Sequence, residues 1–316
     1  MRSKIRYIIK VEFVLWEIIA MTDMQNMNQT PSSATNKRSY GTFRAFKWIA
    51  LLSAPTLVIL RTLNLFIFFE NDIGYYESGA ILPTVFNCLA ILIVLTVAVV
   101  SVAVFRKHSP MPLIYSVSAK CASVFVALGF AAYALLAILT PFSWLDNFAA
   151  MTVNKMSPVI YYSVTALNIL APLAACVYFV LYALGKLSRG AAFGLGIGAL
   201  ITMIITLALS YFNPYIQMNA PEKLAVHLGC ICALLFILAE MRVMCGAARK
   251  ALYHFTMMSC AALLPAMSLP TVIASFTGAL HGSPAVPDPI NYVFLAMGVF
   301  AIVRLIMLDT SKTKGV

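Results

Sequence analysis

Two polar residues inside an apolar stretch give this sequence its first candidate site. Arg61 lies in the second half of the apolar stretch 47–69, and Asn64 follows about one helical turn later on the same face. A charge in hydrocarbon costs several kcal/mol unless it is paired or solvated, so a retained arginine suggests a role. Arg61 could bind the anionic group of a solute. Alternatively, it could extend outward along the helix toward the carboxylates of Glu70 or Glu77.

A second group of charges lies near the other end of the predicted helices. Glu240 closes the apolar stretch 223–241, Arg242 follows it, and Arg304 lies at a similar depth in the stretch 290–308. Opposite charges at one depth can neutralise each other. We therefore predict an ion pair of Glu240 with Arg304 or with Arg242, which would fasten the inner ends of these helices. Alternatively, each side chain extends alone to the membrane surface.

His227 and Asn168 are two further polar residues within apolar stretches. His227 falls near the start of 223–241, and Asn168 falls near the middle of 158–184. Either could contact a solute. The sequence favours a buried, hydrogen-bonded histidine and an asparagine that bonds between helices.

Small residues recur at every fourth position of the stretch 191–212. They are Gly190, Gly194, Gly198, Thr202, Thr206 and Ser210. In lipid, helices associate where small side chains allow close approach of the backbones, as in the G-x-x-x-G pattern. We predict a tightly packed central helix, with a small-residue wall along a pathway as the alternative. Interior prolines in other stretches, such as Pro172, Pro265 and Pro270, interrupt backbone hydrogen bonding and are common around transporter sites.

Long apolar stretches position all of these residues. The chain of 316 residues is 62% hydrophobic and 10% charged, whereas a soluble domain is nearer a quarter charged. A membrane-spanning helix needs about 20 apolar residues. Eight stretches qualify, and they predict an all-α, polytopic transmembrane bundle with helices near 47–69, 80–105, 121–142, 158–184, 191–212, 223–241, 255–276 and 290–308.

Basic residues in the connections predict the orientation of the bundle. Lysines and arginines gather on the side of residues 37–47, and only Lys155 and Lys223 fall on the other side. By the positive-inside rule, both termini are then cytoplasmic. We expect residues 41–316 to form one transmembrane domain. Residues 1–40 would be an extension that is flexible, or interfacial, or partly an artefact of an upstream start, since Met21 and Met24 are alternative starts.

Several classes of function lack their motifs in this sequence. No P-loop, H-E-x-x-H or G-x-S-x-G pattern occurs, and the seven cysteines do not have zinc-site spacing. We therefore expect no enzyme activity, no cofactor and no metal. The basic residues that give the net charge of +11 lie between apolar segments and do not form a soluble basic face. We therefore expect no nucleic-acid partner.

Two hypotheses about function stay open. One is a permease or channel-like protein for a small solute, with Arg61, Asn64, Asn168 and His227 as candidate contacts. The other is a scaffold, sensor or assembly subunit that acts through a partner membrane protein. In both cases the lipid bilayer surrounds the chain, and a bacterial cytoplasmic membrane is the expected location. Arg61, Asn168 and His227 would line one cavity under the first hypothesis and would be separately paired under the second.

Overall fold

The computed structural model describes residues 33–70, 74–104, 116–139, 157–212, 220–247, 249–278 and 289–310. Within these residues, eight helices are long and apolar enough to cross a membrane. The predicted class, a multi-pass helical membrane bundle, is therefore confirmed. The helices are α2 (Ser33–Ile67), α3 (Ile81–Val104), α4 (Val117–Leu139), α6 (Pro158–Ala183), α7 (Arg189–Phe212), α8 (Pro221–Met244), α9 (Lys250–Phe276) and α10 (Ile290–Thr310).

The predicted helix boundaries agree closely with the observed ones. Apart from the start of α2, the largest differences are the starts of α4 and α9, which precede the predicted starts at 121 and 255. Both missed turns carry a lysine, Lys120 in α4 and Lys250 in α9. Charged residues lower the local hydropathy, although the backbone hydrogen bonds of a helix continue through them.

The amino-terminal part of α2 differs from the prediction. Residues 33–40 were expected in the extension, but they are the first turns of α2, which carries on beyond the apolar stretch. Residues 1–32 lie outside the described part of the chain. The chain divides into two compact units, Met1–Phe43 and Arg44–Val316, and all eight spans belong to the second.

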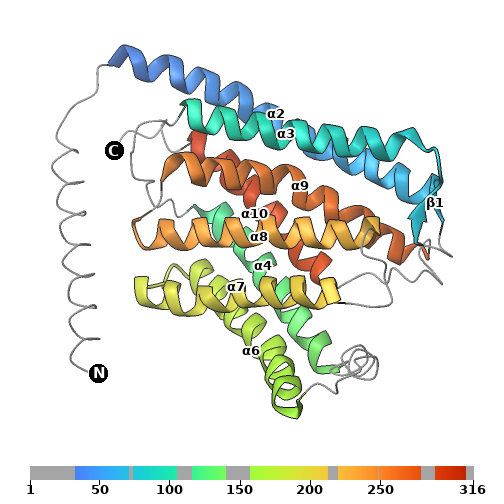
Figure 1. The fold of residues 1–316 in the computed structure, drawn as a ribbon. Coiled ribbons are helices and arrows are strands. Elements are labelled where there is room, and N and C mark those ends of the chain that lie inside the picture. Colours follow the sequence, from blue (N-terminus) through green and yellow to red (C-terminus); the bar gives the residue numbers. More distant parts are fainter. Residues whose placement is uncertain are drawn as a thin grey trace, which may run out of the picture. The chain divides into compact units, whose positions relative to one another are not determined.

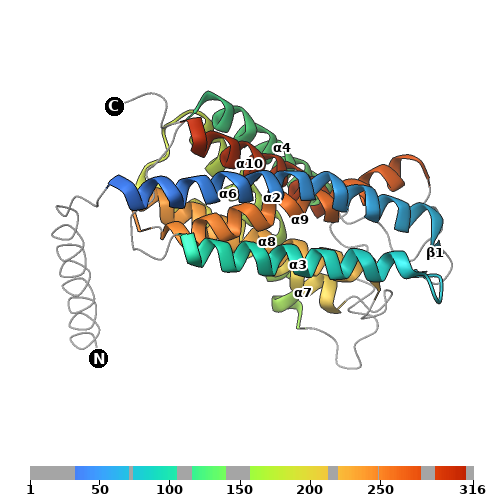
Figure 2. The ribbon, with the colours of Figure 1, turned by 90° about the horizontal axis from the view of Figure 1, so that it is seen from above.

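Within Arg44–Val316, six helices contact one another in a closed ring. The order of contacts around the ring is α4, α6, α7, α8, α9, α10 and back to α4. Figure 1 shows α8 between α7 and α9, and the turned view in Figure 2 shows α4 beside α10. Outside the ring, α3 contacts α9. A short antiparallel hairpin of β1 (Phe69–Glu70) and β2 (Tyr75–Tyr76) connects α2 to α3.

The hairpin distinguishes the two ends of this unit. We call the end where α2 and α9 finish and α8 begins the hairpin end, and the opposite end the far end. Aromatic rings fill the ring of helices. Phe300 of α10 lies 5.9 Å from Phe179 of α6, 5.6 Å from Tyr182 of α6 and 6.0 Å from Phe236 of α8, between ring centroids. Stacked and edge-on rings at such distances stabilise a core beyond their buried area.

Helix α9, and not α7, is the most buried helix of the bundle. In α9, 89% of the most apolar stretch is buried, against 39% in α7. The row of small residues on α7 is also used only in part. Gly198, Thr202 and Thr206 are buried, whereas a Cβ added to Gly190 or Gly194 would meet no atom within 4 Å. A row at every fourth position drifts around the helix, so one straight neighbour cannot cover all of it.

Close packing of α7 on α6 depends on Gly198. A Cβ there would lie 2.6 Å from the Cβ of Ala174 and 2.8 Å from the carbonyl oxygen of Ala171. Backbone atoms cannot move aside as a flexible side chain does. The adjacent Thr202 hydroxyl donates to the Gly198 carbonyl oxygen at 2.9 Å, so it bonds within its own helix and not across to a neighbour.

Gly198→Ala is therefore expected to destabilise the protein by about 1–3 kcal/mol, since overpacking costs that much. Gly194→Ala, one turn earlier in the same helix, is the matched control and should lose no stability, because alanine is the better helix former and meets no neighbour. Thermal unfolding of both purified variants in the same detergent measures the difference. Equal midpoints for the two variants would contradict the packing argument.

Candidate functional site

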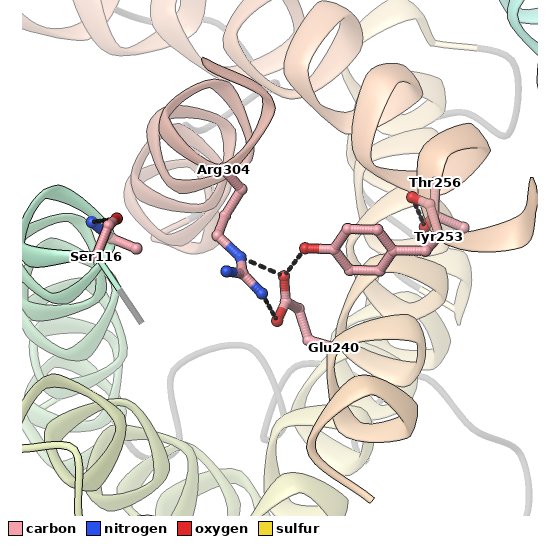
Figure 3. Close-up of polar contacts among 6 residues, drawn as sticks. Ser116, Glu240, Tyr253, Thr256 and Arg304 are labelled. Carbon is pink, nitrogen blue, oxygen red and sulfur yellow. Dashed lines mark hydrogen bonds and ion pairs between the residues drawn. The ribbon is translucent and has the colours of Figure 1, made fainter. Parts of the chain in front are cut away.

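Glu240 and Arg304 form a buried ion pair near the far end of the bundle. Arg304 donates from Nε to Glu240 Oε1 and from Nη2 to Oε2, both at 3.1 Å, and the Tyr253 hydroxyl donates to Oε1 at 2.5 Å. Figure 3 shows the Glu240 carboxylate between the guanidinium and the phenol. We call these three residues the Arg304 cluster. It joins α8, α9 and α10, and the ionic side chains are only 4% and 3% exposed.

Aromatic rings surround the guanidinium of this cluster. The Cζ atom of Arg304 lies 5.9 Å from the ring centroids of Tyr182 and Tyr253 and 6.0 Å from that of Phe300. A ring face attracts a cation, more strongly where water is excluded. Of the two predicted pairings, the structure contains Glu240–Arg304. Arg242 is half-buried and forms no ion pair with Glu240 among the described contacts.

Arg61 lies in a second buried ion pair, near the hairpin end. Its Nη2 donates to Glu222 Oε1 at 2.6 Å, and its Nη1 lies 3.0 Å from the sulfur of Met267. The hydroxyl of Thr271 donates to the other carboxylate oxygen, Glu222 Oε2, at 2.8 Å. The ionic side chains are 3% and 9% exposed. We call Arg61, Asn64, Glu222, Met267 and Thr271 the Arg61 cluster, and they come from α2, α8 and α9.

Unlike the Arg304 cluster, the Arg61 cluster has unused hydrogen-bonding groups. Arg61 Nε is buried and has no hydrogen-bond partner in the described structure, and the same is true of both side-chain atoms of Asn64. Asn64 is fully buried, at 0% exposure. Leaving a polar group buried without a partner costs about 1–3 kcal/mol. Such groups are rare in native proteins, and each one calls for an explanation.

Tyr76 of the hairpin lies close enough to the Arg61 cluster to sense its charges. Burial raises the pKa of its phenol to about 12, the guanidinium of Arg61 opposes this rise, and the carboxylate of Glu222 adds to it. The phenol is therefore neutral at physiological pH and can donate a hydrogen bond. The hairpin thus places a polar aromatic side chain near the cluster.

The structure differs from the prediction that Arg61 extends toward Glu70 or Glu77. Its carboxylate partner is Glu222, which the sequence analysis left outside the predicted helix 223–241. Helix α8 begins two residues earlier, with Pro221 in its first turn, so Glu222 enters the bundle. Proline is favoured at the first helical position, because its missing N–H would be unpaired there. The Pro221-Glu222 sequence was therefore the signal for this residue.

Asn168 and His227 lie apart from the Arg61 cluster. The Tyr133 hydroxyl of α4 donates to Asn168 Oδ1 of α6 at 3.0 Å and lies 3.1 Å from the Thr206 hydroxyl of α7, so Asn168 bonds between helices as predicted. His227 is half-buried, 6.2 Å from the ring of Tyr211, and its Nε2 has no hydrogen-bond partner in the described structure. The predicted hydrogen bond of His227 is therefore not formed through Nε2, and it stays a prediction for Nδ1. Among the described contacts, none joins Arg61, Asn168 and His227 to one another.

Comparison of the chain with protein-family models, with curated proteins and with solved structures finds no match. Among the described residues, no group of three or more His, Cys, Asp or Glu side chains could hold a metal ion.

Removing one partner of the Arg304 cluster should destabilise the bundle strongly. Arg304→Met leaves the Glu240 carboxylate buried without a counter-charge, and breaking such a pair costs about 3–5 kcal/mol. Replacing the whole cluster by apolar residues of similar volume (Glu240→Leu, Tyr253→Phe and Arg304→Met together) should recover most of that loss. Detergent-solubilised thermal unfolding of both variants tests this. A triple variant less stable than Arg304→Met would show that the ions stabilise beyond neutralising each other.

Tyr76 should make stability depend on pH in the alkaline range. The phenol of the unfolded chain ionises near pH 10, and that of the folded chain near pH 12. Its contribution to stability is therefore complete below about pH 10 and is lost as the pH rises through about 12. Tyr76→Phe should lose less stability than the parent over this interval. Unfolding midpoints against pH measure the difference, with Tyr75→Phe as the control for loss of a hairpin hydroxyl. Parallel curves for parent and Tyr76→Phe would refute the assignment.

Proposed function

We propose that this multi-pass membrane protein is a permease for a small polar solute, with the Arg61 cluster as the solute site. The observation that carries the proposal is the incomplete hydrogen bonding of Arg61 and Asn64, both buried in the bundle. A solute that supplied the missing hydrogen-bond partners would recover the free energy that burial of these unpaired groups costs. This gain would give the site its affinity.

The ionic character of the cluster supports a role beyond stability. An apolar replacement of a buried ion pair is often as stable as the pair itself, so stability alone does not account for it. Ionisable residues within membrane spans face the bundle interior and mark pathways for ions and substrates. Arg61 and Glu222 both meet this description, with side chains 3% and 9% exposed.

The Arg304 cluster supplies the closed side of the proposed pathway. Its carboxylate accepts three hydrogen bonds, and the rings of Tyr182, Tyr253 and Phe300 surround its guanidinium. Solute at the Arg61 cluster would then exchange with the hairpin side until the Arg304 cluster opens. We place the far end in the cytoplasm, which the excess of basic residues in the connections on that side supports.

Helix α9 would couple the two clusters. It contributes Tyr253 to one cluster and Met267 and Thr271 to the other. Met267 lies between Pro265 and Pro270, where the helix lacks backbone N–H donors. A helix weakened at this point can bend near the solute site while its first turns stay fixed.

A scaffold, sensor or assembly subunit is the second candidate, and a specific observation favours it. Arg61 and Asn168 each hydrogen-bond to a different protein partner, Glu222 and Tyr133, and among the described contacts none joins either of them to His227. Such a protein would keep its ion pairs closed and would act through another membrane chain. Under this hypothesis, water would not reach the Arg61 cluster.

Access of water to Met267 separates the two candidates. In a background without the seven native cysteines, Met267→Cys is treated with a charged, membrane-impermeant thiosulfonate from each side of the membrane. The permease proposal predicts labelling from the hairpin side. It also predicts labelling from the far side once Glu240→Gln weakens the Arg304 cluster.

The native Cys260 alone, in the same background, is the matched control. It is equally buried in α9 but donates to the Cys232 carbonyl oxygen of α8, at 3.1 Å, and should remain unlabelled. If Met267→Cys reacted no faster than Cys260 in folded, monodisperse protein, the permease proposal would fail and the second candidate would stand.

A further inference from the structure

We infer that the solute class of the Arg61 cluster is a small zwitterion, such as an amino acid, with its carboxylate on Arg61 and its ammonium group on Glu222. That the bound zwitterion is also the transported solute rests on the proposed function. The binding chemistry follows from the cluster alone.

Charge balance favours a zwitterion over a simple ion. Arg61 and Glu222 neutralise each other at 2.6 Å in a buried site. An anion that took Arg61 would leave the Glu222 carboxylate without a counter-charge, and a cation that took Glu222 would leave Arg61 without one. A buried unpaired charge is expensive. A zwitterion replaces the one internal pair with two new pairs, and the net charge of the site stays zero.

Among the described residues, two arginines are buried, Arg61 and Arg304, and their comparison shows what Arg61 lacks. Arg304 presents Nε and Nη2 together to the two oxygens of Glu240, which is the bidentate arrangement that a guanidinium prefers with a carboxylate. On Arg61 the same edge is half used, because Nη2 donates to Glu222 and Nε has no partner. The carboxylate of an incoming zwitterion would complete this edge as Glu240 completes that of Arg304.

Glu222 is oriented to receive the other end of such a molecule. The Thr271 hydroxyl donates a hydrogen bond to Oε2 at 2.8 Å. The carboxylate therefore stays in place when the bond between Oε1 and Arg61 breaks. An ammonium group offers three donors and could take Oε1 in its stead. Asn64, fully buried with its amide oxygen and nitrogen both unpaired, supplies one more acceptor and one more donor about one turn from Arg61.

Other unpaired buried groups do not offer a comparable set. Among the described residues, Ser101, His227 and Ser259 each have one buried side-chain atom without a hydrogen-bond partner, and no ion pair includes any of them. In the part of the chain that the structure describes, the Arg61 cluster alone combines both charges with unused hydrogen-bonding groups.

Binding can be measured on the whole purified protein in lipid nanodiscs by thermal unfolding. The probes are glycine, L-alanine, L-serine and γ-aminobutyrate, each at millimolar concentration. For L-alanine the matched compounds are N-acetyl-L-alanine, which lacks the ammonium charge, and L-alaninamide, which lacks the carboxylate. At least one zwitterion should raise the unfolding midpoint by a few degrees, since a ligand bound only to the folded state stabilises it. The blocked compounds should leave it unchanged.

Asn64→Leu provides the variant that separates binding from folding. It replaces two unpaired polar atoms by methyl groups on the same branched skeleton, so its stability without ligand should equal or exceed that of the parent. Its response to the zwitterion should nevertheless be lost. The inference is overturned if no zwitterion stabilises the parent protein, if a blocked compound stabilises it equally, or if Asn64→Leu keeps the full response.

This experiment and the labelling of Met267→Cys fail separately. Zwitterion binding with labelling of Met267→Cys from the hairpin side, but with none from the far side in Glu240→Gln, would support the inference about the site and would refute transport. Water access without any effect of the zwitterions would support transport and would refute this solute class. If both hold, the stabilising zwitterion should also slow the labelling of Met267→Cys.

Discussion

The requirement that charge inside a membrane be neutralised within the protein organises this bundle. The membrane-spanning stretches contain two acidic residues, Glu222 and Glu240, and both belong to α8. They are 240 − 222 = 18 residues apart, or about 27 Å along the helix. Each pairs with an arginine from the interior of another span, Arg61 of α2 or Arg304 of α10. Helix α8 therefore ties α2 and α10 at opposite ends of the bundle.

Much of the fold follows from hydropathy, because each span must be long and apolar whatever its neighbours are. The Glu240–Arg304 pair could also be predicted from the sequence, because two opposite charges at the same depth in lipid have few other partners. Which helix would be most buried was not predictable in this way. The small residues of α7 suggested that helix, but Gly194 faces open space, and α9 is covered by α3, α8 and α10. The spacing of the small residues identifies one face of a helix, but it does not identify the neighbouring helix that covers this face.

The Arg61 cluster was only half predictable for a related reason. Arg61 and Asn64 stand out because polar residues in an apolar stretch are rare, and their helical spacing places them on one face. Glu222 lies one residue before the predicted helix 223–241. This error in the helix boundary does not change the topology, but it left the carboxylate that pairs with Arg61 out of the predicted site. Met267 and Thr271 carry no signal in the sequence, because a methionine and a threonine in a membrane helix are ordinary. Only the packing of α9 against α2 and α8 brings them to the charges.

The difference in completeness between the two clusters follows from their positions along α9. Near its start, α9 contains no proline that interrupts its backbone hydrogen bonds, and the Tyr253 hydroxyl donates a hydrogen bond to Glu240. Near its end, Pro265 and Pro270 remove two backbone donors, and Pro265 lies so close to α10 that a Cβ on Gly298 would be 2.8 Å from its ring. The helix is thus fastened on one side of Met267 and weakened around it. A change of partner at Arg61 would therefore displace the last turns of α9 more readily than the first, and the Arg304 cluster would keep the far end closed while the hairpin end responds.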